Sequence, residues 1–233
     1  MFSEKRKRGR PAGRTPEGEA TRRRLYDVAT RLVAERGYDG ATLREVAERA
    51  GVSASLLYRY FPSKRAVVLA FYDELSDLYA REAGAVPRGK WRDRFAFALL
   101  TSLRVLGPHR QTLRALAPAM VGEGEEGLFA RATAFSRTRV QGAFRAAVVG
   151  ASDAPAPRLA EALARLLYLL HLAVILWWLL DRSPGQRATA GLVALLRRAL
   201  PAAALTLRLP LVRGFVLSAD DLLGQALLDP ASS

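Results

Sequence analysis

Apolar residues recur at helical spacing along most of this 233-residue chain, and no other feature limits its fold as strongly. The first such stripe consists of Leu25, Val28, Ala29, Leu32 and Val33. Residues at these offsets lie on one face of a helix. Comparable patterns follow downstream, and strand-like alternation is absent apart from an ambiguous stretch at 205–217. The sequence therefore predicts an all-α protein.

Glycines and capping residues divide the start of the chain into short helices. We expect a first helix over 21–37, ended by its final glycine. Thr42 and Glu45 have the spacing of a capping box and begin a second helix. After a glycine turn, a third helix covers 53–60, and a fourth follows it. Two short helices joined by such a turn have the proportions of a helix-turn-helix.

The rest of the sequence predicts a larger helical body. Its expected helices cover residues 91–106, 113–120, 128–149, 158–180 and 186–204. Residues 1–20 contain almost nothing apolar, so they cannot offset the entropy lost on ordering and are expected to form a flexible basic arm. We therefore divide the chain into an arm at 1–20, a head at 21–66 and a body at 67–233.

One apolar run, from Leu166 to Leu180, raises the question of a membrane span. It has 15 residues with His171 among them, and a membrane-spanning helix needs about 20. We expect a buried core or dimer helix here and no membrane partner. The N-terminal residues lack the apolar core of a secretory signal, so a cytoplasmic location is expected.

The charge balance indicates a polyanionic partner. The chain has 36 Lys and Arg against 22 Asp and Glu, a net charge of +14. Residues 1–65 hold 16 basic and 8 acidic side chains, so the first quarter carries +8 of this total. A dense positive field attracts nucleic acid.

The sequence lacks the residues and motifs that several classes of enzyme and metal protein require. There is no cysteine, which excludes a disulfide framework, a thiolate nucleophile and an iron–sulfur cluster. The two histidines, His109 and His171, lie in no metalloprotease motif, and no nucleophile elbow occurs. The glycine pattern at 122–127 is expected to be a loop, and Asp220–Asp221 a helix start rather than a metal site. We therefore expect no catalytic residue, metal or cofactor.

The segment Thr42–Lys64, TLREVAERAGVSASLLYRYFPSK, resembles the DNA-binding signature of the tetracycline-repressor (TetR) family of bacterial transcriptional regulators. The resemblance covers about residues 21–75. It implies a three-helix DNA-binding head and a C-terminal helical body that binds an effector and dimerises. Arg59 and Ser55 depart from residues common in the family, which leaves the operator sequence open.

The resemblance also implies roles for the residues of this segment. Those expected to face base edges or the adjoining backbone are Ser53, Ser55 and Leu56. Those expected to reach phosphates or lie over the groove are Tyr58, Tyr60 and Arg59. Thr42 and Lys64 begin helices, where free amides and the helix dipole favour a phosphate oxygen. Capping or packing is the alternative role for each of them.

The arm holds a shorter motif, Arg8-Gly9-Arg10-Pro11, similar to the core of an AT-hook. Its thin backbone would let Arg8 and Arg10 enter a narrow A·T minor groove. A nonspecific basic tail is the alternative, and either form releases counterions from DNA.

Aromatic residues and histidines of the body form a second set of candidates. Helical phase puts Tyr168, His171 and Trp178 on one stripe, with Trp177 on a neighbouring one. An apolar pocket with an occasional polar group suits a small apolar effector. The residues expected to line it are His109, Phe135, Tyr168, His171, Trp177 and Trp178. Plain core or a subunit interface is the alternative.

These expectations combine into a ligand-responsive regulator, a repressor that binds a palindromic double-stranded DNA operator as a homodimer on the nucleoid. The resemblance places the dimer contact on 158–180 and 186–204 and makes the fourth helix, 63–83, the lever between ligand and DNA. An architectural or nonspecific nucleic-acid-binding protein is the alternative function.

Overall fold

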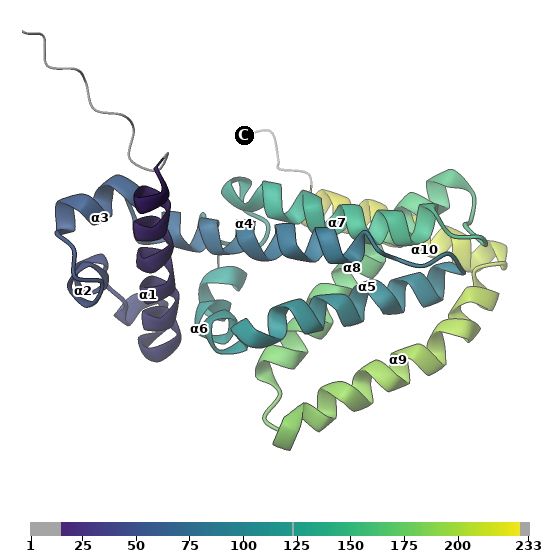
Figure 1. Ribbon diagram of the computed structural model, residues 1–233. Coiled ribbons are helices and arrows are strands. Elements are labelled where there is room, and N and C mark those ends of the chain that lie inside the picture. The colour runs from purple at the N-terminus through teal and green to yellow at the C-terminus, as the bar shows by residue number, and fades with distance from the viewer. Residues whose placement is uncertain (1–14, 123, 229–233) are drawn as a thin grey trace, which may run out of the picture. The chain divides into compact units, whose positions relative to one another are not determined.

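The computed structural model describes residues 15–122 and 124–228 and divides the chain into two units, which meet between Phe71 and Tyr72. Both units are built of helices, and the described residues contain no strand, which confirms the all-α prediction (Figure 1). The unit boundary lies inside helix α4 (Lys64–Ala83) and five residues beyond the expected end of the head at 66.

The head consists of α1 (Pro16–Gly40), α2 (Leu43–Arg49), α3 (Ala54–Tyr60) and the first turns of α4. The expected start of α1 at Thr21 was wrong, because the helix begins at Pro16. The Thr15 side chain accepts a hydrogen bond from the Gly18 amide (3.1 Å), and a proline suits the first helical position. Apolar periodicity gives no sign of this polar first turn. Residues 1–14 of the arm lie outside the described residues.

The expected end of α1 is marked by a break in the backbone. Gly37 has φ 79° and ψ 169°, outside the helical region, and one further turn follows to Gly40. The Ala41 amide closes that turn by donating to the Gly37 carbonyl (3.2 Å). A residue with a β-carbon is strained at this φ, so glycine is needed here.

The predicted apolar stripe of α1 forms the core of the head. Leu25 and Leu32 are fully buried, as is Leu57 of α3, while Val68 and Phe71 of α4 are nearly so. Burying a leucine contributes about 1.5–3 kcal/mol relative to leaving it exposed. These contacts hold the short α3 helix in place, since seven residues do not form a stable helix on their own.

The capping box expected for α2 is only half formed. Thr42 accepts a hydrogen bond from the Glu45 amide (3.2 Å), as expected. The Glu45 carboxylate instead forms ion pairs with Arg36 of α1 (2.9 Å) and Arg49 of α2 (3.0 Å). Two guanidinium groups within reach attract the carboxylate more strongly than one backbone amide.

The body contains six further α-helices among the described residues. They are α5 (Trp91–Leu106), α6 (Arg110–Val121), α7 (Ala134–Val149), α8 (Pro157–Leu180), α9 (Arg187–Thr206) and α10 (Pro210–Leu223). Short helical turns η1 (Gly107–His109), η2 (Arg131–Thr133), η3 (Pro184–Gln186) and η4 (Gly224–Leu228) adjoin them. Helix α8 contacts α5, α6, α7, α9 and α10, so it is the central helix of this unit (Figure 1).

Two expectations for the body were wrong. Helix α7 begins at Ala134 and not at 128, because Thr133 donates to the Gly127 carbonyl (2.6 Å) and fixes a turn before the helix. Asp220 does not start a helix: it lies in the third turn of α10, buried, and pairs with Arg165 of α8. The start of α10 at Pro210 falls inside the stretch whose periodicity was ambiguous.

Two segments of the body are long and apolar enough to cross a membrane, by length and composition alone. They are α8 and residues 184–206. The run at 166–180 is thus part of a 24-residue helix, longer than its apolar core suggested. Half of the most apolar window of α8 is buried inside the body, as expected of a core helix, whereas only 17% of the corresponding window in 184–206 is buried.

Candidate nucleic-acid interface and ligand cavity

Helix α3 is set at the end of a tight turn. Gly51, between α2 and α3, has φ 65°, a backbone conformation that glycine adopts without strain. Ser53 then caps α3 by accepting a hydrogen bond from the Leu56 amide (3.2 Å), and its hydroxyl lies 3.0 Å from that of Ser55. The two serines expected to approach DNA are therefore exposed and hydrogen-bonded to each other.

One face of α3 is open and the opposite face is anchored. Ser55, Tyr58 and Arg59 lie three and four residues apart, so they share a face, and all three are exposed, Tyr58 by 51%. Leu57 points the other way into the core of the head, and Leu56 and Tyr60 are half-buried at the edges. A hydroxyl, a phenol and a guanidinium on one exposed face can donate to phosphates and base edges. We refer to Ser55, Tyr58 and Arg59 as the α3 face.

Thr42 and Lys64, which begin helices, differ in exposure and in the hydrogen bonds that their side chains already make. Thr42 is exposed and uses its oxygen to cap α2, which leaves its hydroxyl proton available. Lys64 is half-buried: its ammonium donates to the carbonyl of Tyr38 (2.5 Å) and lies 4.4 Å from the centre of that ring. An ammonium has three protons, so Lys64 can still contact a phosphate while it connects α4 to the end of α1.

An ion-pair network connects α1 and α2. Arg49 contacts Glu35 (2.6 Å) and Glu45 (3.0 Å), and Glu45 also contacts Arg36. The hydrogen bond from Arg49 holds the pKa of the Glu35 carboxyl below its ordinary value. These carboxylates are paired within the head, which weakens their repulsion of a phosphate backbone.

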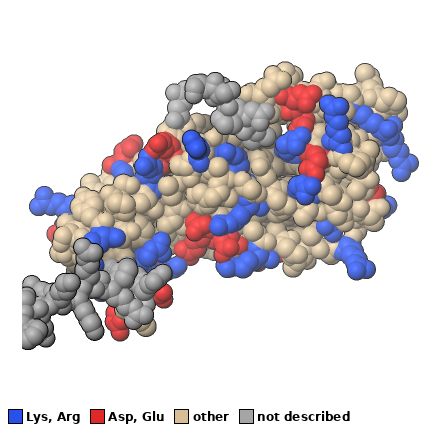
Figure 2. Space-filling model, turned by 90° about the horizontal axis from the view of Figure 1, so that it is seen from above, with Lys and Arg blue, Asp and Glu red and all other residues tan. Residues whose placement is uncertain are grey.

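Charged side chains of both signs are mixed on one face of the molecule (Figure 2). On the face shown in Figure 2, Lys and Arg side chains are interspersed with Asp and Glu and do not gather in one patch. Arg8 and Arg10, which belong to the densest basic run of the sequence, lie outside the described residues.

The model of bacterial regulatory proteins of the tetR family matches residues 25–71. This stretch is therefore similar to the N-terminal domain of TetR-family regulators. The match ends at the same residue as the first structural unit, so the domain that the sequence signature covers is also the one that packs as a unit.

Curated HTH-type transcriptional repressors are similar to short stretches of this chain. The transcriptional repressor KstR of Rhodococcus jostii is 49% identical over 43 residues, which are 18% of this chain and 20% of that protein. Repressor KstR2 of the same organism is 37% identical over 73 residues, 30% of this chain and 36% of that protein. The chain thus matches about a fifth to a third of the length of these relatives.

For the body, comparison with solved structures shows the fold alone. The crystal structure of a TetR-family regulator from Streptomyces coelicolor is similar to this one, with a TM-score of 0.59 and 22% sequence identity. The matched region covers 92% of each chain. The sequence predicted a helical body after a helix-turn-helix head, and this structural similarity agrees with that prediction.

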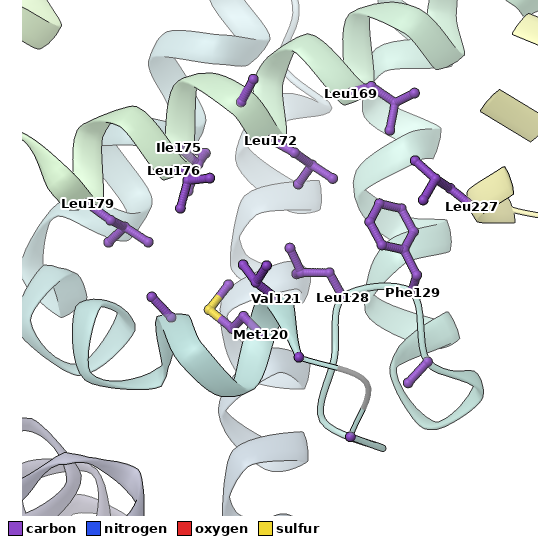
Figure 3. A pocket seen from close by; sticks show the side chains of 15 residues that line it. Met120, Val121, Leu128, Phe129, Leu169, Leu172, Ile175, Leu176, Leu179 and Leu227 are labelled. Atoms are coloured by element: carbon purple, nitrogen blue, oxygen red, sulfur yellow. The ribbon is translucent and has the colours of Figure 1, made fainter.

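A large apolar pocket opens in the body. It has a volume of about 650 Å³ and is lined by the end of α6, Gly122, residues 124–130 of the following loop, one face of α8 and Leu227. Figure 3 shows that its side chains, among them Met120, Phe129 and Leu172, offer only carbon and one sulfur. We call it the outer pocket.

A smaller cavity of about 110 Å³ adjoins the outer pocket and is lined by α4 to α8. Both share a wall of four residues, Met120, Leu128, Leu172 and Ile175. We call the smaller one the inner cavity. Its lining includes two of the six residues expected at an effector site, Tyr168 and His171.

The other four expected residues do not line either space. Trp178 is buried and donates to Gln186 (2.9 Å), while Trp177 is half-exposed. Phe135 is exposed beside Arg139, and His109 belongs to η1. The helical stripe therefore separates into a cavity-facing part and a part that connects α8 to its neighbours.

Burial controls the chemistry of the inner cavity. His171 Nε2 lies 2.8 Å from the Ser102 hydroxyl, and burial lowers the pKa of its imidazole to about 3, so the ring is neutral at pH 7. Burial likewise raises the pKa of Tyr168 to about 12 and that of Tyr79 further. His171, Tyr79 and Tyr168 are therefore uncharged hydrogen-bonding groups at pH 7.

Six polar residues of the inner cavity were not expected from the sequence: Tyr72, Ser76, Tyr79, Ser102, Ser136 and Arg137. Ser102 and Tyr79 are polar positions on otherwise apolar helix faces, and Arg137 is an arginine at such a face of α7. Polar residues within an apolar stripe are the signal that could have found them. In residues 15–122 and 124–228, no group of three His, Asp or Glu residues could hold a metal ion.

Proposed function

We propose that this protein is a sequence-specific transcriptional regulator, a repressor that binds a palindromic operator as a homodimer and responds to a small ligand. The two relatives named as repressors support the sign of regulation. On this proposal the protein acts in the cytoplasm, on nucleoid DNA, and as a binding protein rather than an enzyme.

The observation that carries the DNA-binding role is the α3 face. Three side chains that can donate hydrogen bonds stand exposed on a short helix, which Leu57 anchors in the core from the opposite side. A helix of this size fits the major groove of B-DNA, which is about 12 Å wide. Small residues at its start, Ser53 and Ser55, allow close approach, while Thr42 and Lys64 fix the phosphate backbone.

Selection from a random duplex pool tests this function. The full chain is expected to enrich a symmetric motif with half-sites about one helical turn apart, or slightly more. Enrichment of A·T-rich duplexes without symmetry would favour the architectural alternative. Replacing Leu57 by Ala, which removes the anchor of α3, should abolish the enrichment.

A second copy of this chain is the partner we propose for α9. The helix is strongly apolar yet mostly exposed, and Leu195 and Leu205 are each 63% exposed. Exposed apolar surface of this extent marks an interaction site. Arg197 and Arg198 lie near the middle of the 184–206 segment, where a membrane interior would penalise them by about 2.5–3.5 kcal/mol each. Exposed residues of α8, Trp177 and Leu180, extend the same proposal.

The ligand response is assigned to the outer pocket and the inner cavity. Helix α4 contributes Lys64 to the head and Tyr79 to the inner cavity, so it is the element through which we propose that the two communicate. A ligand changes DNA affinity only if it binds the two states of the protein unequally.

A further inference from the structure

The inner cavity contains polar atoms without a protein partner. His171 and Tyr79 are 4% and 2% exposed, and among the described residues His171 Nδ1 and the Tyr79 hydroxyl have no hydrogen-bond partner. Their rings are stacked, with centres 6.3 Å apart. Buried polar groups without partners are costly, so two of them in one cavity lining indicate a ligand that satisfies them.

The same cavity is lined by one charged residue, Arg137 of α7. Its guanidinium donates to the carbonyls of Leu128 (2.9 Å) and Ala130 (3.2 Å), which orients the side chain from the loop that precedes α7. Both acceptors are bonded to a single nitrogen, Nη1, and a guanidinium has five protons in all. In the part of the chain that the structure describes, no ion pair involves Arg137. A fixed positive charge at an otherwise neutral cavity favours an anion.

Three potential donors, Arg137, His171 and Tyr79, line this small cavity. With Nε2 accepting from the Ser102 hydroxyl, the neutral His171 ring carries its proton on Nδ1, which then donates. The Tyr79 hydroxyl and the free protons of Arg137 donate as well. A cavity of about 110 Å³ has room for a small polar group such as a carboxylate.

The outer pocket supplies the remainder of the site. It is six times larger than the inner cavity, its described lining contains no charged residue, and four residues border both spaces. An apolar chain or ring system could occupy it while a head group enters the inner cavity. The arrangement selects for a molecule with two chemically different ends.

We infer that the effector is a carboxylate with a long apolar body, whose hydrocarbon part fills the outer pocket and whose carboxylate accepts hydrogen bonds from Arg137, His171 and Tyr79. That this ligand acts as an effector rests on the proposed function of the protein as a ligand-responsive regulator. The binding site itself stands on the cavity geometry.

Binding measurements with matched probes test this inference. Dodecanoate, its methyl ester and 1-dodecanol have the same hydrocarbon chain and differ at the head group. Titration calorimetry with the full chain at pH 7 is expected to show dodecanoate binding at least tenfold more tightly than either neutral probe. Arg137→Gln should remove this preference, and Tyr79→Phe, which keeps the ring, should weaken dodecanoate binding several-fold more than binding of the ester.

Arg145→Gln is the matched control, since Arg145 is an exposed arginine on the same helix. It should bind all three probes as the wild type does. Because Arg137 also holds a loop, Arg137→Gln could loosen the pocket, but that effect would weaken acid and ester alike and leave their ratio unchanged. Equal affinities of the wild type for acid and ester, or no binding of dodecanoate, overturns the inference.

The inference and the proposed function fail separately. If the protein prefers the carboxylate but enriches no symmetric DNA motif, the carboxylate site is supported and the proposed regulator function is contradicted. If the protein enriches a symmetric motif but binds dodecanoate and its ester with equal affinity, the regulator function is supported and the carboxylate site is contradicted.

Discussion

The Lys64 ammonium lies 4.4 Å from the centre of the Tyr38 ring and donates to the carbonyl of the same residue. This lysine was expected to contact DNA, with capping or packing as its alternative role, and the structure shows that it connects α4 to the end of α1. Replacing Lys64 by Ala should therefore weaken DNA binding across all sequences and lower the free energy of unfolding by about 1–2 kcal/mol.

Denaturant titration and duplex binding measure these two effects. Arg65→Ala, at the exposed neighbouring position, is the control for stability. A Lys64→Ala protein with wild-type stability would show that the contacts with Tyr38 contribute nothing.

The α3 face predicts two different kinds of DNA-binding defect. Tyr58→Phe removes an exposed hydroxyl that we propose contacts a phosphate, so affinity should fall by about 1 kcal/mol on every duplex. Ser55→Ala should instead change the preferred base at one position of each half-site. Binding to a panel of single-base operator variants separates the two patterns, and identical profiles for both proteins would refute the assignment of roles.

The arm predicts a change in salt dependence. Deleting residues 1–14 removes Arg8 and Arg10 and leaves Thr15, the cap of α1, in place. Each lost phosphate contact should reduce the slope of log affinity against log salt concentration by about 0.9. Titrations at several salt concentrations measure it. An arm that contributes nothing would leave both slope and affinity unchanged.

His171 predicts how stability depends on pH. Its pKa is about 3 in the folded protein and near 6.5 in an unfolded chain, so below pH 6.5 the unfolded state binds a proton that the folded state does not. Stability should therefore fall as pH decreases, by about 2 kcal/mol between pH 7 and pH 5 from this group. Tyr79 and Tyr168, which contact the ring, stay neutral in this range.

The His171→Asn protein lacks the titrating group and serves as the reference. Urea unfolding at both pH values should show a loss about 2 kcal/mol smaller than in the wild type. Equal losses in the two proteins would mean that His171 is not buried in solution.

The exposed surface of α9 predicts the oligomeric state. Leu195→Glu places a charge on the proposed dimer surface at a position 63% exposed in one chain, so the fold should tolerate it while the dimer dissociates. Sedimentation equilibrium measures the mass. Ala188→Glu, at an exposed position in the first turn of the same helix, is the control. A dimer of undiminished affinity in Leu195→Glu would place the interface elsewhere.

Local signals in the sequence predicted much of the head and part of the body. Ser53, a glycine turn and an apolar anchor define α3, and the bounds of α5 follow from periodicity alone. The start of α1 was missed because Pro16–Ala20 carry no apolar stripe, although Thr15 and Pro16 mark a helix start.

The cavity was less predictable, because it is assembled from helices far apart in the chain. Ser102 and His171 are 69 residues apart, and no local pattern brings them to 2.8 Å. Four of the six aromatic and histidine residues expected at the site do not line it, whereas the polar lining includes a tyrosine, a serine and an arginine on three other helices. Which faces of these helices meet depends on packing around α8, which periodicity does not encode.

The central claim is that α3 reads DNA from the major groove, and dimethyl sulfate footprinting on the selected operator tests it most directly. This reagent methylates guanine N7 in the major groove and adenine N3 in the minor groove. The account predicts protection of guanine N7 in two half-sites on one face of the duplex, lost with Leu57→Ala. Protection confined to adenine N3, or none within the motif, would contradict it.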